Sequence, residues 1–294
     1  ITFLLSCLNA TSAEVQTTLC SLLELHGDLW EVVLVSQENI SDTLFAELRD
    51  PRIKHRQSDQ SHLFDLITGE YVIYCQAGDI FADSLLIHFY HSLSTETHAD
   101  LTYYDCEYFD GKPARLQPFF KPTRFSPALL LSVNYLSRAF IHRQALENIW
   151  SKIDHNAELI NQEYDLTLRL CESNKVFRHI PNILLTQKYL VKPDTPELQK
   201  ALAAHLNRQG LKDVSKSQVA TGFRFSWKTG TPSLAIIILS RNNYRFLKSL
   251  IPELLAQPYE GQYSFHIVDN DSDDPSTLSY YQKIQQEANI SIIP

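Results

Sequence analysis

The chain of 294 residues contains no methionine, only eight glycines and an odd number of cysteines. None of its five cysteines has C-x-x-C spacing, which argues against a zinc site or a disulfide framework and indicates reduced thiols in a cytoplasmic protein. No apolar run reaches the roughly 18–20 residues that cross a bilayer. Glycine-rich phosphate loops and the G-x-S-x-G motif are also missing, which excludes the nucleotide-binding and hydrolase classes that carry them.

The charge balance excludes a further class. The net charge is −8 at pH 7, which argues against general nucleic-acid binding while leaving room for a local basic patch. A composition of 44% hydrophobic and 20% charged residues is typical of a soluble globular protein, and the length allows two domains. Because ordinary usage would supply several methionines, we also expect residues, methionines among them, to be missing from the printed chain.

What the chain does contain is a long-range repeat. Two stretches near its opposite ends share the order apolar strand, helix, apolar strand. The stretches 1–9 and 31–36 of the first copy match 235–243 and 265–269 of the second. Ser6 is paired with Ser240 and Ser36 with Asp269, at separations that differ by one residue. A repeat at this spacing predicts two copies of one domain rather than a solenoid of short units.

The first copy continues as alternating strands and helices. Thr11-Ser-Ala-Glu14 has capping-box spacing for a helix, and further helices are predicted at 41–49 and 62–68. Strands are predicted at 1–5, 30–35, near residue 53, at 71–75 and at 101–104. This order predicts an α/β fold, with a mostly parallel sheet between two layers of helices. The segment 105–134, rich in aromatic residues and proline, is expected to form loops.

Three parts are predicted along the chain. The first domain takes 1–190, a connector takes 191–232, and the opening of a second domain takes 233–294. The connector contains one clear helix at 197–209. About sixty residues are too few to complete a second sheet of this kind, so we expect the gene to continue for roughly another 150 residues or more.

Acidic loops follow three of the predicted elements, and the clearest is Val268-Asp-Asn-Asp-Ser-Asp-Asp-Pro275. In a parallel sheet the loops at the carboxyl ends of strands form the ligand crevice. Asp269 and Asp271 could therefore accept hydrogen bonds from a nucleobase or ribose. The alternative is an ordinary turn that caps the next helix. In the first copy Ser36 stands where Asp269 stands in the second.

A second loop, Gln76-Ala-Gly-Asp79, follows the predicted strand 71–75. Two carboxylates one residue apart would bind Mg²⁺ or Mn²⁺ together with substrate phosphates. This loop supplies only Asp79, so it is either a weakened metal site or a structural turn.

A third group is Asn161-Gln-Glu-Tyr-Asp-Leu-Thr-Leu-Arg169. It places Glu163 and Asp165 near the start of a helix, where the dipole favours negative charge. A carboxylate there could deprotonate an acceptor hydroxyl as a general base. The alternative is charge decoration of a helix N-terminus.

Several motifs in order resemble glycosyltransferase family 2, in the bacterial form that carries two such domains in tandem. Ala99-Asp-Leu-Thr-Tyr-Tyr-Asp-Cys-Glu107 is similar to the family's ADLIYSDED segment, and Phe119-Phe-Lys-Pro122 with Leu130-Leu-Ser-Val-Asn-Tyr135 to YFKP…LLSQNY. Gln162-Glu-Tyr-Asp-Leu-Thr-Leu-Arg169 resembles QDYDLALR, and His179-Ile-Pro-Asn-Ile-Leu184 resembles HIPEVLY. The helix at 204–210 and the Asp269 loop resemble the family's inter-domain helix and VDNGS segment. The resemblance covers essentially the whole chain.

The resemblance implies a GT-A fold and a glycosyltransferase of bacterial cell-surface polysaccharide synthesis. The donor would be a nucleotide-diphosphate sugar, the acceptor a glycan or lipid-linked sugar, and the transfer inverting with a divalent metal, Mg²⁺ or Mn²⁺. It implies a cytoplasmic protein and leaves room for peripheral association with the inner face of the membrane. By position, Glu163 would be the base and Asp165 its support. The resemblance also implies donor-binding or acceptor-binding roles for Asp79, Asp105, Glu107, Asp269 and Asp271. Asp79 would in addition bind the metal.

The first domain departs from the family pattern at its donor site. Ser36 replaces the nucleotide-contacting aspartate, and Gln76-Ala-Gly78 replaces D-x-D. The segment 57–66 is short and lacks the expected Gly-x-x-x-Ala-x-Asn stretch, while Thr186-Gln-Lys188 replaces His-Trp-Arg. Ser36, Gln76 and Lys188 are therefore altered binding positions. Two functions stay open: a working transferase with a modified donor site, or an inactive module that binds glycan or supports an active second domain.

Overall fold

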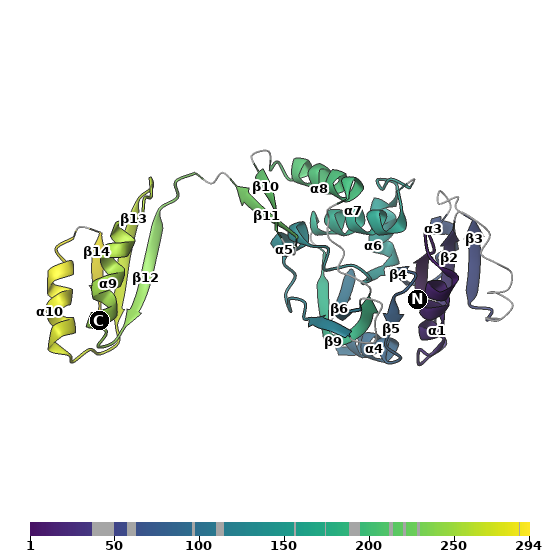
Figure 1. Ribbon diagram of the computed structural model, residues 1–294, viewed down its shortest axis with the longest axis horizontal. Coiled ribbons are helices and arrows are strands. Elements are labelled where there is room, and N and C mark those ends of the chain that lie inside the picture. The colour runs from purple at the N-terminus through teal and green to yellow at the C-terminus, as the bar shows by residue number, and fades with distance from the viewer. Residues whose placement is uncertain are drawn as a thin grey trace. The chain divides into compact units, whose positions relative to one another are not determined.

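The computed structural model divides the chain into two compact units, Ile1–Ser226 and Trp227–Pro294 (Figure 1). The structure describes residues 1–36, 50–57, 63–95, 98–109, 115–155, 157–173, 175–187, 195–211, 214–219, 222–227, 230–287 and 289–294. The helix predicted at 41–49 and the candidate residue Lys188 lie outside the described residues. No helix within the described ranges is long and apolar enough to cross a membrane.

The first unit is built on one mixed sheet. Its strands are β1 (Thr2–Ser6), β2 (Glu31–Ser36), β3 (Ile53–Gln57), β4 (Tyr71–Gln76), β5 (Ile80–Phe81), β6 (Leu101–Phe109), β7 (Arg115–Phe119), β8 (Phe140–His142) and β9 (Phe177–Gln187). In the described residues they follow the order β3-β2-β1-β4-β8-β6-β9-β5, with β7 paired to β6. The β1–β2, β1–β4, β2–β3 and β6–β9 pairs are parallel, and the short strands β5 and β8 pair antiparallel. The expected α/β class with a mostly parallel sheet is confirmed.

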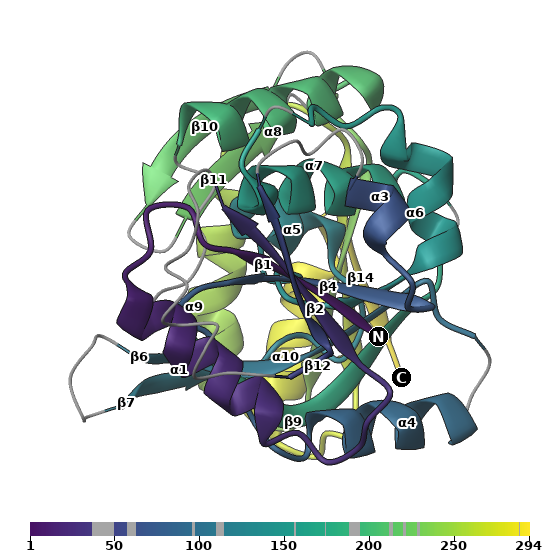
Figure 2. The same ribbon diagram turned by 90° about the vertical axis from the view of Figure 1, so that its right-hand side faces the viewer.

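Helices cover both faces of this sheet. They are α1 (Ser12–Leu23), α3 (Leu63–Leu66), α4 (Leu85–Thr95), α5 (Pro127–Ser132), α6 (Arg143–Trp150), α7 (Leu159–Cys171) and α8 (Pro196–Arg208). One buried cluster joins the sheet to α1 and α4, and another joins the opposite face to α6 and α7 (Figure 2). The second cluster extends to α8, which packs against α7. The predicted three-layer arrangement is therefore present.

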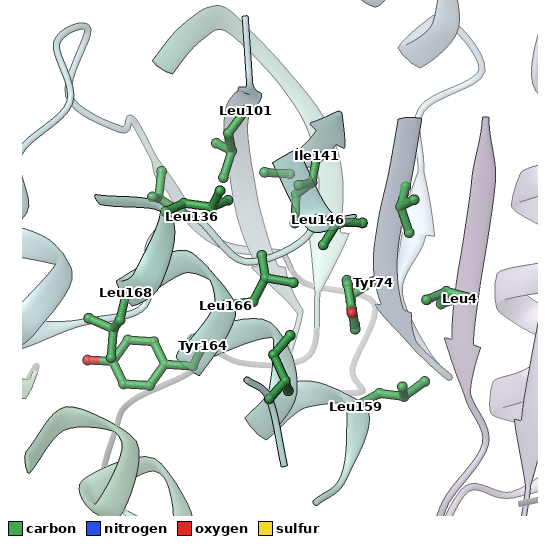
Figure 3. Packing of buried hydrophobic residues seen from close by; sticks show 14 of the residues in the cluster. Leu4, Tyr74, Leu101, Leu136, Ile141, Leu146, Leu159, Tyr164, Leu166 and Leu168 are labelled. Carbon is green, nitrogen blue, oxygen red and sulfur yellow. The ribbon is translucent and has the colours of Figure 1, made fainter. Parts of the chain in front are cut away.

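Strand β1 shows why the sheet is apolar on both faces. Phe3 and Leu5 belong to the cluster with α1, whereas Leu4 belongs to the cluster with α7, and all three are fully buried. A central parallel strand must be apolar at consecutive positions for this reason. Figure 3 shows Leu4 and Tyr74 of the sheet in the same cluster as Leu159 of α7.

The connection from β1 to α1 follows the sequence prediction. The backbone N–H of Glu14 donates to Thr11 Oγ1 at 3.3 Å, and the Thr11 N–H donates to Glu14 Oε2 at 2.9 Å. This reciprocal capping box fixes the start of α1 directly after the carboxyl end of β1. The loop between them is thereby held at the edge of the sheet where a ligand crevice is expected.

The second unit repeats the first β-α-β steps. It contains β12 (Leu234–Ser240), α9 (Tyr244–Leu255), β13 (Tyr263–Asp269), α10 (Pro275–Ile284) and β14 (Ile290–Ile293), and its three strands are parallel. Along the chain, the two repeats are separated by strands β10 (Val214–Val219) and β11 (Gly222–Trp227), which form a two-stranded sheet.

The strand register corrects one pairing within the repeat. Ser240 lies beside Asp269 across β12 and β13, but across β1 and β2 Ser6 lies one residue short of Ser36. Cys7 is therefore the counterpart of Ser240, and the prediction that Ser6 matches Ser240 is wrong by one residue. With the corrected register the two copies keep one constant separation.

The corrected register also shows how the two sheets differ. Leu4 is fully buried in the first unit, whereas its counterpart Ile237 is 67% exposed and Leu239 is 78% exposed. Ile236 and Ile238 pack toward α9 and α10, so the exposed residues lie on the opposite face. Within the described residues, no other element of the second unit covers this face of its sheet.

Candidate functional site

A pocket of about 270 Å³ lies where three strands of the first unit end. It is bordered by the residues after β1, after β4 and at the end of β9, which are the carboxyl ends of these strands. Its lining residues are Leu8, Asn9, Ala10, Glu14, Gln76, Ala77, Asp79, Arg138, Glu158 and Gln187. Asn9 has a φ of 57°, a left-handed conformation that asparagine tolerates, and it turns the chain away from β1.

One wall of the pocket is a buried ion pair. Arg138 Nε donates to Asp79 Oδ2 at 2.8 Å, and Arg138 Nη2 donates to Gln76 Oε1 at 3.1 Å. The Gln76 N–H donates to the same Asp79 oxygen at 2.8 Å. The side chains of Arg138 and Asp79 are 3% and 4% exposed. The loop after β4 is thus fixed by an arginine from a distant part of the chain.

The backbone of Arg138 is held as firmly as its side chain. Its φ of 63° is left-handed, which is uncommon and costly for a residue other than glycine. Its N–H donates to Glu163 Oε1 at 2.5 Å, and its carbonyl accepts from the Tyr104 hydroxyl at 2.6 Å. Both peptide groups of this turn are therefore held by buried partners.

Glu163 lies behind this arginine, fully buried on α7. Its Oε2 has no hydrogen-bond partner among the described residues and lies 3.6 Å from Arg138 Nη1. Burial raises the pKa of Glu163 to about 7, against the opposing effect of the Arg138 charge. The carboxyl group is therefore poised between its two protonation states near neutral pH.

Asp105 is a second buried acidic residue, on strand β6. Its Oδ1 accepts from the Lys121 N–H at 2.8 Å and lies 2.7 Å from His179 Nε2. Burial lowers the pKa of the Lys121 ammonium. Glu107, two residues along β6, accepts from the Thr186 hydroxyl at 2.8 Å.

The structure brings together some of the acidic residues expected in one crevice. Asp79 and Glu163 contact the same arginine, and Asp79 borders the pocket. Asp105 and Glu107 do not border it. Asp165 points elsewhere: it pairs with Arg169 at 2.9 Å and lines a separate pocket of about 200 Å³ beside α8. Among the described residues, the contacts of Asp165 are with Arg169 and Arg208 rather than with Glu163, and its supporting role stays a prediction.

Ser36 is not among the described lining residues of this pocket, and Asp269 and Asp271 belong to the second unit. Ser36 shares a 2.8 Å hydrogen bond with His55 Nε2. In the second unit, Asp269 accepts from the Ser272 N–H at 3.0 Å and from the Tyr281 hydroxyl at 3.0 Å. Asp269 therefore already fixes its own turn, while Asp271 is exposed, with a φ of 60°.

The residues at Asp79 do not fit the divalent metal that the sequence resemblance implies. The carboxylate accepts from Arg138, Gln76 provides an amide that accepts from the same guanidinium, and Gly78 offers no side chain. A metal ion would have to displace a buried cation from its partner. Among the described residues, no three His, Cys, Asp or Glu side chains are grouped as metal ligands.

Sequence reasoning missed Arg138, and it named Gln187 only as part of the altered segment Thr186-Gln-Lys188. Arg138 follows the segment 105–134 that was expected to form loops, in a stretch for which the sequence predicted no element, and nothing in its spacing marks it as the partner of Asp79. Its contact with the loop after β4 depends on β8, which follows it, inserting between β4 and β6.

Comparisons with known proteins identify the fold. No protein-family profile matches the chain. The O-antigen biosynthesis protein RfbC of Myxococcus xanthus is 26% identical over 232 residues, covering 75% of this chain and 18% of that protein. The uncharacterized protein y4gI of Sinorhizobium fredii is 23% identical over 284 residues, covering 87% of this chain and 31% of that protein. The chain thus spans less than a third of either curated relative.

Solved structures of Staphylococcus aureus TarS resemble the chain. The complex of TarS residues 1–349 with UDP superimposes with a TM-score of 0.54 and 16% identity, covering 70% of this chain and 65% of that one. The complex with UDP-GlcNAc gives a TM-score of 0.51 at 17% identity. The fold is that of the GT-A glycosyltransferases, and the resemblance expected from the sequence motifs is confirmed at this level.

Proposed function

We propose that this protein is a glycosyltransferase of polysaccharide synthesis. It would move a sugar from a nucleotide-diphosphate-sugar donor to a glycan or lipid-linked acceptor, with inversion. The observation that carries the proposal is the pocket at the carboxyl edge of a GT-A sheet, walled by Asp79 and Arg138 with Glu163 behind them. The name of the Myxococcus relative and the nucleotide complexes of the staphylococcal structure support it.

The proposal extends to organisation and location. Under this proposal the chain consists of a first GT-A domain at 1–190, a connector at 191–232 and the opening of a second GT-A domain at 233–294. It places the reaction in the cytoplasm and at the inner face of the membrane, because a lipid-linked acceptor would lie there.

Glu163 is the proposed general base. An inverting transfer requires a group that removes the proton of the acceptor hydroxyl, and a base works best when its pKa lies near the working pH. The pKa of about 7 meets this condition. Oε1 is taken by the Arg138 N–H, so the proton would go to Oε2, which has no hydrogen-bond partner among the described residues.

Glu163→Gln tests this role against Asp165→Asn. We expect Glu163→Gln to lower turnover by about 100-fold or more, the scale of a lost general base. Asp165→Asn should leave turnover near the wild-type value, because Asp165 lies outside the pocket and pairs with Arg169. The measurement is transfer from UDP-GlcNAc, GDP-mannose and dTDP-glucose to glycan and lipid-linked acceptors, followed as released nucleoside diphosphate. Equal activity of wild type and Glu163→Gln would remove Glu163 from the mechanism.

A second candidate function rests on the Asp79–Arg138 pair. With Gln76 and Gly78 in place of an acidic pair, the first unit would bind glycan or support another catalytic unit without transferring sugar itself. Titrating UDP, GDP and dTDP with and without Mn²⁺ separates the two candidates. Binding that disappears in Asp79→Asn supports a donor site in the first unit. If the protein binds none of the three nucleotides, the second candidate function is supported.

A further inference from the structure

Helix α8 lies in the segment 191–232, the predicted connector, and is part of the compact unit Ile1–Ser226. Leu198 and Leu202 of α8 are buried in the same cluster as the leucines of α7. Figures 1 and 2 both show α8 lying along α7, on the side away from the sheet. Helix α7 is therefore enclosed between the sheet and α8, and its position depends on both.

Charged side chains join the two helices at their carboxyl ends and form the Glu172 cluster, which consists of Glu172, His205 and Arg208. Arg208 Nε donates to Glu172 Oε1 at 2.8 Å and to Oε2 at 2.9 Å. His205 Nδ1 lies 2.7 Å from Glu172 Oε1. Burial raises the pKa of Glu172, but hydrogen bonds from Arg208 and His205 outweigh this effect and lower the pKa below its ordinary value. A carboxylate with several donors holds one geometry better than an isolated surface pair does.

The remaining packing between α7 and α8 is incomplete. A pocket of about 200 Å³ lies between them, bordered by Asp165 and Arg169 of α7 and by Ala201 and Ala204 of α8. Atoms that border a void lose the contacts that would otherwise hold the two surfaces together. The Glu172 cluster therefore contributes a larger share of the attachment than it would in a fully packed interface.

Glu163 lies on the opposite face of α7. At 3.6 residues per turn, Glu172 lies about 180° around the helix from Glu163. Glu163 is fully buried beside Arg138, whereas Glu172 contacts α8. A displacement of α7 at its α8 face therefore moves Glu163 relative to Arg138. A misplacement of about 1 Å can lower a reaction rate about 100-fold.

We propose that the Glu172 cluster holds α7 against α8 and thereby fixes Glu163 in position for its reaction with the acceptor hydroxyl. Arg208 and His205 are positioning residues, because they act through α7 and are not among the described residues that line the pocket at Asp79. The inference rests on the proposed function, since the position of Glu163 affects turnover only if the protein transfers sugar.

The Asp165→Asn variant leaves this cluster in place. Arg208 Nη2 lies 2.7 Å from Glu172 Oε1 and 3.7 Å from Asp165 Oδ1. The contact with Glu172 is therefore the one that attaches α8 closely, and Asp165→Asn remains a suitable control for Glu163→Gln.

Hydrogen exchange of the α7 amides, measured by mass spectrometry on the whole chain, tests the cluster without requiring transfer activity. Arg208→Met should speed exchange in Leu159–Cys171 by about tenfold. Arg52→Met is the matched control and should leave α7 at the wild-type rate. Arg52 and Asp50 are 26% and 19% exposed, close to the 28% and 17% of Arg208 and Glu172. Arg208→Lys keeps the charge and should lie between Arg208→Met and wild type.

Turnover gives the second readout. In Arg208→Met, kcat for sugar transfer should fall by about tenfold to 100-fold, because Glu163 is misplaced. The KM for the donor should stay within about twofold, since the residues that line the pocket are unchanged. Arg52→Met should keep both constants at their wild-type values. If Arg208→Met does not fold in a thermal unfolding control, Arg208→Lys and His205→Gln provide the same comparisons.

The ionisation of Glu163 gives a third readout, which needs no donor. The carbon-13 signal of its carboxyl group, assigned by its loss in Glu163→Gln, should titrate near a pKa of about 7 in wild type. In Arg208→Met the pKa should move toward the ordinary 4.5, because a displaced α7 admits water to the carboxyl group. The ionisable groups that act on Glu163 or that Glu163 acts on are the same in both proteins: Arg138, Asp79, Lys121, Tyr74, Cys75 and Tyr104.

Two results would overturn the inference. One is exchange of α7 in Arg208→Met that is no faster than in Arg52→Met. The other is faster exchange of α7 that leaves both turnover and the titration of Glu163 unchanged. If wild type transfers sugar but α7 is not loosened, this inference fails and the proposed function stands. If wild type transfers no sugar from any donor, the proposed function fails, and exchange with titration still decides whether the cluster positions Glu163.

Discussion

An Arg138→Met variant is expected to lose about 3–5 kcal/mol of unfolding free energy, because it leaves a buried charge without its partner. Arg138 is the ion-pair partner of Asp79 at 2.8 Å and lies 3.6 Å from Glu163. Methionine has a similar length and can fill the same space. The lost unfolding free energy therefore reflects the removed charge rather than a new cavity. It should be largest above pH 7, where Glu163 is ionised. Urea unfolding followed by circular dichroism measures it.

Arg143→Met is the matched control for this substitution. Its Nε lies 3.9 Å from Glu147 Oε1 on α6, and the two side chains are 39% and 49% exposed. Exposed pairs of this kind contribute about 0–1 kcal/mol. Adding Asp79→Asn to Arg138→Met should recover part of the loss, because the unpaired charge is then gone. A loss in Arg138→Met no larger than in Arg143→Met would show that the buried pair contributes nothing to stability.

The stability of the wild-type protein should fall as pH rises from about 4.5 to about 7, by roughly 3 kcal/mol from this one group. Glu163 has a pKa of about 7 in the folded protein and an ordinary value of 4.5. Between these values the folded state binds more protons than the unfolded state. Stability is therefore fully present below the unfolded pKa and is lost as pH rises through the folded pKa. Urea midpoints across this range measure the slope.

Glu163→Gln removes the titrating group and serves as the reference. The difference between wild type and Glu163→Gln should change sharply between these pH values and level off on either side. Groups shared by both proteins cancel in the difference. If the stabilities of wild type and Glu163→Gln changed with pH in the same way, Glu163 would have its ordinary pKa, despite its burial and its contacts with Arg138.

Much of the fold was predictable because its strands are local apolar runs. Consecutive apolar residues predict strands β1, β2 and β4, and the capping box of Thr11 and Glu14 predicts the start of α1. The segment 105–134 was harder, since strands β6 and β7 and helix α5 run through residues expected to be loops. Strand β8 has three residues, too few to show a period of two, and only its neighbours β4 and β6 make it a strand.

The candidate site was predictable in part. The loop after β4 and the start of α7 were recognised from their acidic residues, and Asp79 and Glu163 do contact a common partner. Helical geometry alone separates Asp165 from Glu163, because residues two apart on an α-helix differ by about 200° in direction. Arg138 could not be foreseen, since its role comes from a left-handed turn and from contacts distant in sequence.

Strand β12 combines two features that a soluble protein normally keeps apart. Among the described residues it lies at one side of its three-stranded sheet, with an unpaired row of backbone groups, and it also exposes Ile237 and Leu239. Unpaired backbone donors and acceptors beside bare aliphatic side chains form a template on which another polypeptide can add as a strand. Within the described residues, strand β12 carries both parts of such a template.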